Sequence, residues 1–416
     1  MNEEKHIPAG YKPSLLGPIP EDWEVRRLGE VCDIDKESLS NKTDPNYEFD
    51  YISLSDVDSD CFETTTSKQK FRTAPSRARR IVKQGDVIIS TVRPNLQAFT
   101  LIKDKVKDLI VSTGFAVLTP KKIISEYLYQ YVFSYPVSKQ FYQLVVGSNY
   151  PAVNSSDVSH LKIAFPPLPE QQRIVSVLSL WDTAIAKQTA LIEKLTLRKR
   201  GLMQQLLTGK KRLEGFGGEW KEVRLGEIGV FFKGGGVPKD KITNSGNKCL
   251  TYGDLYTKYD FVISDVKSYI DDHTANESVK IRYGDICFAG SGETKEDIGK
   301  CAAFIDNEYG YAGGDIIVFR ANDCNQITLS YILNSSDVIR QKSNMGQGHS
   351  VVHIYPYQLE KLLIKLPSRA EQDAIATILM ESDKEIEIQK QKLAAMQAQK
   401  KGLMQVLLTG KKRIEI

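Results

Sequence analysis

The sequence of 416 residues contains a long internal duplication. Residues 199–212 read KRGLMQQLLTGKKR and residues 400–413 read KKGLMQVLLTGKKR, so twelve of fourteen positions agree at an offset of 201. The dipeptide Glu-Gln at residues 170–171 recurs at residues 371–372 with the same offset. A repeat on this scale indicates that one structural plan is built twice in the chain.

Each half carries a globular segment of about 150 residues, a proline-marked boundary and a long helical segment. Proline disfavours helix in the residue before it, so Pro166, Pro167 and Pro169 in the first half mark a helix start. Pro367 marks the second start in the same way. The predicted globular domains are residues 1–165 and 216–366, and the predicted helical segments are residues 166–215 and 367–416.

From residue 170 to about residue 207 the chain has no proline, and apolar residues recur in alternating steps of four and three. This spacing is an a/d seam, typical of a helix that pairs with another helix. Polar residues inside the seam fix its register. The seam positions are Ile174, Leu178, Trp181, Ile185, Gln188, Ile192, Leu195, Lys199, Leu202 and Leu206, then Ile375, Leu379, Ser382, Ile386, Gln389, Leu393, Met396, Lys400, Leu403 and Leu407.

A helix of about 38 residues is roughly 57 Å long. Two such helices, separated by a globular half, can pair as an antiparallel coiled coil that holds two heads apart, with a pseudo-two-fold internal repeat. The alternative is that each helix lies on its own domain as an amphipathic helix. Because the helices are near copies, we also expect two equivalent docking sites for one kind of partner, at Leu202, Met203, Leu206, Leu207, Leu403, Met404, Leu407 and Leu408.

The globular halves combine short buried strands with short helices, so the predicted fold class is α/β (α+β). Strands are expected at residues 87–90 and 116–118 of the first half, and at residues 286–289 and 316–319 of the second. Short helices, packed by aromatic and aliphatic side chains, are expected at residues 127–133 and 329–333.

Polar loops follow equivalent strands in the two halves, but their sequences differ. Arginine and lysine neutralise phosphates, and asparagine, glutamine and arginine can make paired hydrogen bonds to base edges. We therefore predict a DNA-reading surface on each head and a split, asymmetric target, although each loop could instead be a solvated surface loop. The candidates are Arg72, Arg77, Arg79, Arg80, Arg93, Asn95, Gln97, Asn149 and Tyr150 in the first head, and Lys233, Lys239, Tyr256, Lys258, Ser291, Lys295, Gln347 and His349 in the second.

The composition argues against several other classes of protein. The net charge is only +4, so a nucleic-acid surface must be a local patch. The six cysteines form no C-x-x-C pair and lie near no histidine cluster, which argues against a zinc site or a disulfide framework. No apolar run approaches the roughly 18 residues of a membrane span, and the N-terminus lacks an apolar signal-peptide core. We expect a soluble, cytoplasmic protein.

Over nearly its whole length the chain resembles the specificity (S) subunit of type I restriction–modification systems. The resemblance is carried by PEDWEV at residues 20–25, RLGE at 27–30, PLPEQQ at 167–172, and GLMQQLLTG at 201–209 with its second copy. The second boundary, LPSRAEQ at residues 366–372, departs from the pattern because it lacks the Pro-Leu-Pro of the first.

This resemblance implies a non-catalytic protein with two target recognition domains, each reading one half of a bipartite sequence in double-stranded DNA. The helices would set the spacer between the half-sites. Two methyltransferase (M) subunits, which bind S-adenosylmethionine and methylate adenine, are the implied partners, and two restriction (R) subunits that use ATP and Mg²⁺ can join them. Neither a cofactor, a metal nor a catalytic residue is expected in this chain itself.

Two other functions stay open at this point. A metal-dependent nuclease, alone or within a fused restriction enzyme, could use Asp285, Glu293 and Lys295, whose spacing loosely matches a carboxylate–carboxylate–lysine centre. The first half has proline and leucine at the positions of Glu293 and Lys295, so that centre would not be duplicated. The other alternative is a coiled-coil scaffold without a role in DNA binding.

Overall fold

The computed structural model describes residues 7–57, 65–145, 151–235, 237, 239–348 and 351–414, with Lys239 described by its backbone alone. The chain divides into two compact units, and each unit holds one globular head and parts of two long helices. The first unit consists of Met1–Thr189 and Gln391–Ile416, and the second of Ala190–Lys390.

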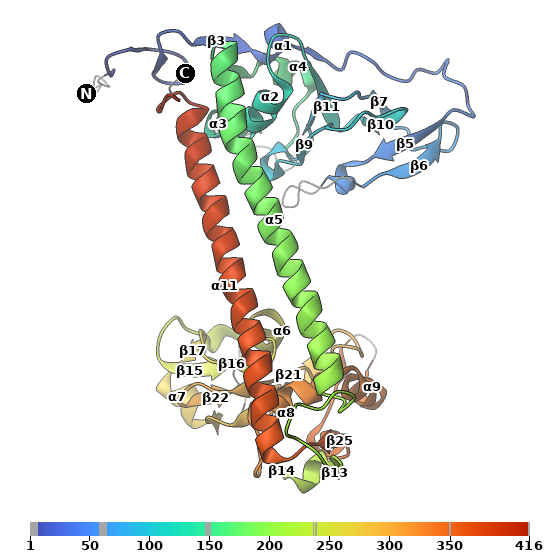
Figure 1. Ribbon diagram of the computed structural model, residues 1–416, viewed down its shortest axis with the longest axis vertical. Helices are drawn as coiled ribbons and strands as arrows, with labels where there is room; N and C mark the ends of the chain where they lie inside the picture. The colour runs from blue at the N-terminus through green and yellow to red at the C-terminus, as the bar shows by residue number, and fades with distance from the viewer. Residues whose placement is uncertain are drawn as a thin grey trace. The chain divides into compact units, whose positions relative to one another are not determined.

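The first head is built on two sheets (Figure 1). One is antiparallel, in the order β4 (Cys32–Ile34), β11 (Phe115–Pro120), β8 (Val87–Ser90) and β9 (Phe99–Leu101). The other has the order β6 (Ser67–Lys70), β5 (Glu48–Ile52), β10 (Leu109–Ser112) and β7 (Ala78–Ile81), in which β5 and β10 are parallel. The remaining elements are the antiparallel pairs β1 (Tyr11–Lys12) with β2 (Ile19–Pro20) and β3 (Glu24–Arg27) with β12 (Lys162–Phe165), the helices α1 (Leu28–Val31), α2 (Ser125–Val132), α3 (Tyr135–Val145) and α4 (Ser155–His160), and the 3-10 turns η1 (Leu54–Asp56) and η2 (Pro94–Leu96).

The second head repeats this arrangement. Its larger sheet has the order β14 (Gly229–Lys233), β23 (Ile316–Ala321), β19 (Asp285–Ala289), β21 (Cys301–Phe304) and β16 (Val262–Ile263). Its smaller sheet has the order β17 (Tyr269–Ile270), β15 (Asn247–Leu250), β22 (Gly310–Ala312) and β18 (Val279–Ile281), again with one parallel pair, β15 and β22. The remaining elements are the pairs β13 (Lys221–Arg224) with β25 (Leu363–Leu366) and β20 (Ser291–Gly292) with β24 (Val352–His353), the helices α6 (Tyr252–Thr257), α7 (Asp272–Asn276), α8 (Gln326–Leu333), α9 (Ser336–Met345) and α10 (Pro356–Leu359), and the turns η3 (Leu225–Glu227) and η4 (Lys239–Lys241).

The strands and short helices expected in the heads are confirmed. The four predicted strands fall within β8, β11, β19 and β23, and the two predicted helices fall within α2 and α8, except that α2 ends at Val132, one residue early. Both β8 and β19 are buried along their whole length. A strand covered on both faces is a continuous apolar run, which is why these segments stand out in the sequence.

The two long helices are α5 (Leu168–Leu206) and α11 (Arg369–Leu407), of 39 residues each. Each begins one or two residues after a proline of the predicted boundary, and each is followed by a glycine in the left-handed conformation, Gly209 or Gly410. Such a glycine is a common helix stop because it has no Cβ to clash. All twenty predicted seam positions are buried or half-buried in the folded chain.

A buried glutamate at the start of each long helix binds an arginine that follows the other long helix. In the first unit, Nε and Nη2 of Arg413 donate to the Glu170 carboxylate at 2.7 and 2.8 Å. In the second unit, Nε and Nη2 of Arg212 donate to Glu371 at 2.7 Å each. Both glutamates are 1% exposed. We call these two ion pairs the latches; their residues correspond at the offset of 201.

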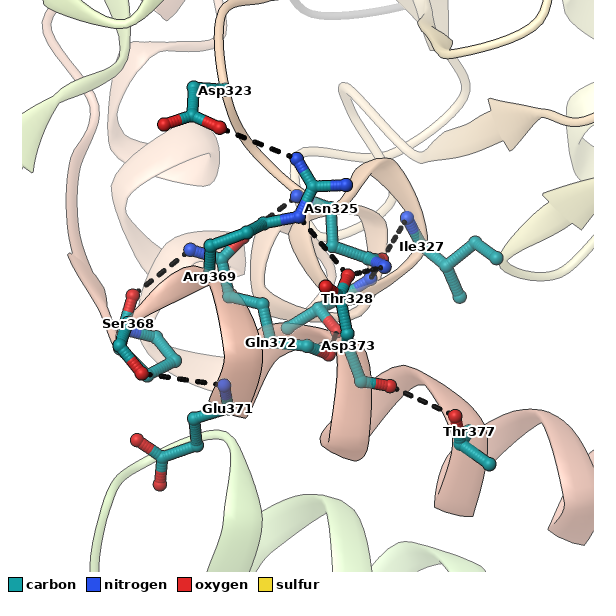
Figure 2. A network of polar contacts seen from close by, with 11 residues as sticks. Asp323, Asn325, Ile327, Thr328, Ser368, Arg369, Glu371, Gln372, Asp373 and Thr377 are labelled. Carbon is teal, nitrogen blue, oxygen red and sulfur yellow. Dashed lines mark hydrogen bonds and ion pairs between the residues drawn. The ribbon is translucent and has the colours of Figure 1, made fainter. Parts of the chain in front are cut away.

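The glutamine after each of these glutamates ties the helix to the head of its own unit. Oε1 of Gln372 accepts from the Asn325 backbone N–H at 2.8 Å, and its Nε2 donates to the Pro367 carbonyl at 3.0 Å. Figure 2 shows this contact, with the Asn325 amide also donating to Asp373 at 2.7 Å. Gln171 makes the matching bonds in the first unit, to Ile124 N–H and the Pro166 carbonyl. The repeated Glu-Gln dipeptide therefore joins three parts of the chain.

The lysines inside the seam make a further pair of matching contacts. Lys400 donates to Asp182 at 2.6 Å, and Gln130 of α2 donates to the same carboxylate at 2.7 Å. In the second unit Lys199 binds Asp383, which also accepts from the Tyr331 hydroxyl of α8. Each seam lysine thus connects its helix to the other helix and, through the shared aspartate, to the adjacent head.

Five of the eight predicted partner-docking residues are buried in the folded chain. Met404, Leu407 and Leu408 are buried in the core of the first unit, and Leu206 and Leu207 in the core of the second. Their neighbours Leu202, Met203 and Leu403 are half-buried and pack against these cores. The apolar end of each helix covers the head in its own unit, and burial there removes it from an external partner.

Replacing Arg413 with leucine should lower the free energy of unfolding by about 3 kcal/mol, because the buried Glu170 carboxylate would lose its cationic partner and keep only the hydrogen bond from the Trp23 indole. The matched control is Arg369→Leu, which removes an ion pair to Asp373 in which the side chains are 46% and 51% exposed. That change should cost less than about 1 kcal/mol. Denaturant unfolding of the purified chain measures both values, and equal losses would contradict a structural role for the latch.

Candidate nucleic-acid interface

In the first head, the loop that follows β8 lies beside residues 151–153. In the sequence these residues come directly after the candidates Asn149 and Tyr150. Val92 forms an antiparallel bridge with Ala152. The Arg93 N–H donates to the Pro151 carbonyl at 2.7 Å, and the Val153 N–H donates to the Thr91 carbonyl at 2.8 Å. The structure therefore brings the predicted loop after β8 next to residues 151–153, which directly follow the other predicted loop residues of this head in the sequence. The candidates Asn149 and Tyr150, on the late loop itself, lie outside the described residues.

The turn η2 presents three of the predicted residues. Arg93 and Gln97, which flank it, adopt left-handed backbone conformations with φ of 49° and 53°. Gln97 Nε2 donates to Ser138 Oγ of α3 at 3.0 Å. The side chains of Arg93 and Asn95 are exposed. Non-glycine residues rarely adopt positive φ, and such strained positions persist where the surrounding structure holds them.

The arginine run of the first head divides into exposed and internally bound side chains. Arg72 and Arg77 are exposed. Arg79 donates to the Ala78 carbonyl at 2.8 Å and lies over the Phe71 ring. Arg80 is 17% exposed and forms an ion pair with Asp35, and burial lowers its pKa. DNA contact through Arg80 would have to compete with that ion pair.

The second head brings its two polar loops together in the same way. Ser291 of β20 pairs with His353 of β24, and the imidazole Nδ1 lies 3.0 Å from the Ser291 hydroxyl. The backbone of exposed Gln347 exchanges hydrogen bonds with that of His353, at 2.7 and 3.0 Å. The candidate His349 lies outside the described residues. His353, which was not among the predicted contacts, sits at this junction.

One predicted residue of the second head, Tyr256, supports its loop from within the protein. The Tyr256 hydroxyl lies 3.1 Å from the carbonyls of both Ser291 and Asp297, and burial raises the pKa of this phenol. Lys258 forms an ion pair with Asp254 at 2.7 Å. Lys233 and Lys295 are exposed, and the side chain of Lys239 lies outside the described residues.

One residue near this loop was not predicted. The Lys342 side chain of α9 is 1% exposed, and its amine donates to the Gly299 carbonyl at 2.6 Å. Desolvation lowers the pKa of this amine. A lysine in a short amphipathic helix gives no sequence signal of burial. The only hint is that Phe141, its counterpart at the offset of 201, is apolar.

The proposed nuclease centre is not assembled. The Asp285 carboxylate accepts two bonds from Arg320 at 2.7 Å each and one from the Arg282 N–H at 3.0 Å. In the first head Asp86 accepts from the Lys83 N–H at 2.8 Å in the same turn. Asp86 and Asp285 therefore stabilise the same structural turn in the two heads. Within the described ranges no group of three His, Cys, Asp or Glu residues could hold a metal ion.

Five cysteines lie within the part of the chain that the structure describes. Cys32, Cys249, Cys287 and Cys301 are buried free thiols, and Cys324 is a half-buried one. Burial raises the pKa of the Cys32 thiol to about 12. No helix among the residues that the structure covers has the length and apolar character to cross a membrane.

Comparison with known proteins agrees with the repeated architecture. A family model described as type I restriction modification DNA specificity domain matches residues 20–197 and again residues 217–398. The putative type I restriction enzyme MjaX specificity subunit of Methanocaldococcus jannaschii is 26% identical over 431 residues, which cover 97% of each chain.

Solved structures share the fold. A chain from a study of complex assembly and conformational transition of the type I R-M system has a TM-score of 0.64 at 24% identity and covers 95% of this chain and 99% of that one. The type I restriction–modification S subunit from M. genitalium has a TM-score of 0.55 at 15% identity and covers 93% and 96%. With two copies of the specificity domain along its length, the chain belongs to the family of type I restriction–modification DNA specificity subunits, the non-catalytic DNA-recognition components of those systems.

Proposed function

We propose that each head reads one half of an asymmetric, bipartite sequence in double-stranded DNA. The observation that carries the proposal is that two polar loops meet at equivalent places in both heads, at Val92 with Ala152 and at Ser291 with His353, while their side chains differ. Phosphate contacts position a protein on DNA, and side chains at base edges specify the sequence. Two heads that share one fold but differ in their loop side chains are suited to recognise two different half-sites.

The exposed loop residues are the proposed DNA contacts. They are Arg72, Arg77, Arg93 and Asn95 in the first head and Lys233, Lys295 and Gln347 in the second. Asn149, Tyr150, His349 and the Lys239 side chain lie outside the described residues, and they stay predicted DNA contacts. Six further candidates bind protein groups through their side chains, and their proposed role is to hold the loops in shape. They are Arg79, Arg80, Gln97, Tyr256, Lys258 and Ser291.

We further propose that residues 1–165 and 216–366 are the recognition domains and that α5 and α11 form an antiparallel coiled-coil spacer with pseudo-two-fold symmetry. The latches and the Lys–Asp pairs support this arrangement, since each contact recurs at the offset of 201. The burial of the seam positions supports it as well. In this arrangement the spacer length sets how many unspecified base pairs separate the half-sites.

The proposed partners are DNA and two adenine methyltransferase subunits, which bind S-adenosylmethionine, with two ATP- and Mg²⁺-dependent restriction subunits where the system includes them. Because the leucines at the helix ends are buried, we place the partner surface on the outer faces of the helices and heads instead. The complex would act in the cytoplasm on the host's own DNA. A target adenine would leave the base stack for the methyltransferase pocket.

Replacing Asn95 with alanine should relax base preference in the first half-site alone, because an amide that pairs with a base edge contributes about 1–3 kcal/mol of discrimination. Replacing Gln347 with alanine is the matched change for the second half-site. Mapping methylated adenines made by the reconstituted complex measures both preferences. If Asn95→Ala altered only the second half-site, the assignment of heads to half-sites would be wrong.

Deleting one heptad from each helix, residues 186–192 and 387–393, should shorten the preferred spacer by about three base pairs. Seven helical residues span roughly 10 Å, DNA rises about 3.4 Å per base pair, and a whole heptad preserves the seam. Methylation mapping gives the spacer directly, and the control is a deletion in α5 alone, which should disrupt assembly. An unchanged spacer in the double deletion would refute the spacer role.

A further inference from the structure

A groove in the first head lies between η2 and α3. It encloses about 340 Å³ and is lined by Asn95 and Gln97 on one side and by Tyr135, Ser138, Lys139 and Tyr142 on the other. The buried ring of Phe141 forms part of its wall. Among the described residues that line it, none carries a carboxylate. A cavity of this size, apolar with a few amide and hydroxyl groups, has the character of a small-ligand site.

The tyrosines of α3 are far more exposed than aromatic side chains usually are. Tyr135 is 62% exposed and Tyr142 is 71% exposed. With Lys139 they occupy positions i, i+4 and i+7, so all three lie on one face of the helix. Exposed apolar side chains that gather beside a cavity mark a binding surface. The lysine between the rings suits an anionic partner.

The other side of the groove carries a strained turn with an apolar tip. The left-handed Arg93 and Gln97 flank η2, and the turn is closed by bonds from Leu96 N–H to Arg93 and from Gln97 N–H to Pro94. Leu96 at its tip is 57% exposed. A rigid turn that holds a leucine in solvent at the expense of backbone strain is typical of a functional site.

The helix α9 of the second head, which corresponds to α3, carries no tyrosine. At the offset of 201, Ser336 and Ser343 stand in place of the two tyrosines, and the buried Lys342 stands in place of Phe141. The cavity beside α9 is smaller, about 190 Å³, and its lining includes Asp260, Glu296 and Asp297. Carboxylates there would repel phosphates. The aromatic groove is therefore a property of the first head, added to the shared frame.

We propose that Leu96 parts one base step of the first half-site and that the groove receives an unstacked DNA base. Apolar side chains act as wedges between base pairs in other DNA-bending proteins. Tyrosine rings stack on any base, and the Asn95 amide can bond to a base edge. This inference rests on the proposed function, and it assigns to this chain part of the work of opening the duplex for the methyltransferase.

The test uses the full chain with its methyltransferase subunits and duplexes that carry 2-aminopurine at successive positions of the first half-site, as mapped by methylation. Besides the adenine that the methyltransferase takes up, wild-type complex should raise the fluorescence at one further position, because the probe brightens when it leaves the stack. Leu96→Ala and Tyr142→Ala should each abolish that rise and weaken binding roughly tenfold. The matched control is Tyr283→Ala, which removes a 56%-exposed tyrosine of the second head and should leave the rise intact.

A second measurement distinguishes a loss of Leu96 insertion between the bases from a loss of folding in the Leu96→Ala variant. A mismatch at the responsive position removes the stacking that Leu96 must break, so it should restore the binding of Leu96→Ala to within about twofold of wild type. A wild-type complex that binds its site without a fluorescence rise at any position other than the methylated adenine would overturn the inference and leave the proposed function intact. Loss of the methyltransferase from Tyr142→Ala, with the rise retained, would also overturn it, since the groove would then be a protein-docking surface. Absence of sequence-specific binding by wild type would instead refute the proposed function.

Discussion

Two buried carboxylates, Glu170 and Glu371, make the interaction on which the rest of this structure depends. Each is bound by two nitrogens of an arginine that lies beyond the end of the other long helix. A buried carboxylate without its partner is strongly destabilising, so the end of one helix has to return to the start of the other. The sequence repeats KKR and EQ because the same contact is made twice.

The two heads share this repeated architecture, but their polar loops differ in sequence and are held in place by different contacts. The first head uses a strained turn whose flanking residue Gln97 is bonded to α3. The second uses internal groups, the Tyr256 hydroxyl and the Lys342 amine, which bind loop carbonyls from beneath. A preformed loop loses little entropy on binding. The frame can therefore stay constant while each loop changes its side chains, which is what recognition of two different half-sites requires.

The sequence was sufficient to predict the secondary-structure elements. It was not sufficient to predict which groups the individual side chains contact. The strands, the helices and the a/d seam can be predicted from the periodicity of the apolar residues. The internal repeat allows each prediction to be made twice. The apolar end of α5 was predicted to be a docking surface, and the same amphipathic pattern also fits a helix that covers a head of the protein. Residue type marked Arg80 as a DNA contact, yet Asp35, distant in sequence, binds it. The aromatic groove and Lys342 were missed for the same reason, since tertiary neighbours decide their roles.

The measurement that tests this account most directly is the mass of the first half on its own. Residues 1–215 contain Glu170 and Arg212, and also Asp182 and Lys199, so two copies can form both kinds of contact with each other. We predict that this fragment is a folded dimer by light scattering and that Arg212→Leu makes it monomeric. A folded, stable monomer of the unaltered fragment would contradict the claim that the two latches are interchangeable and hold the halves together.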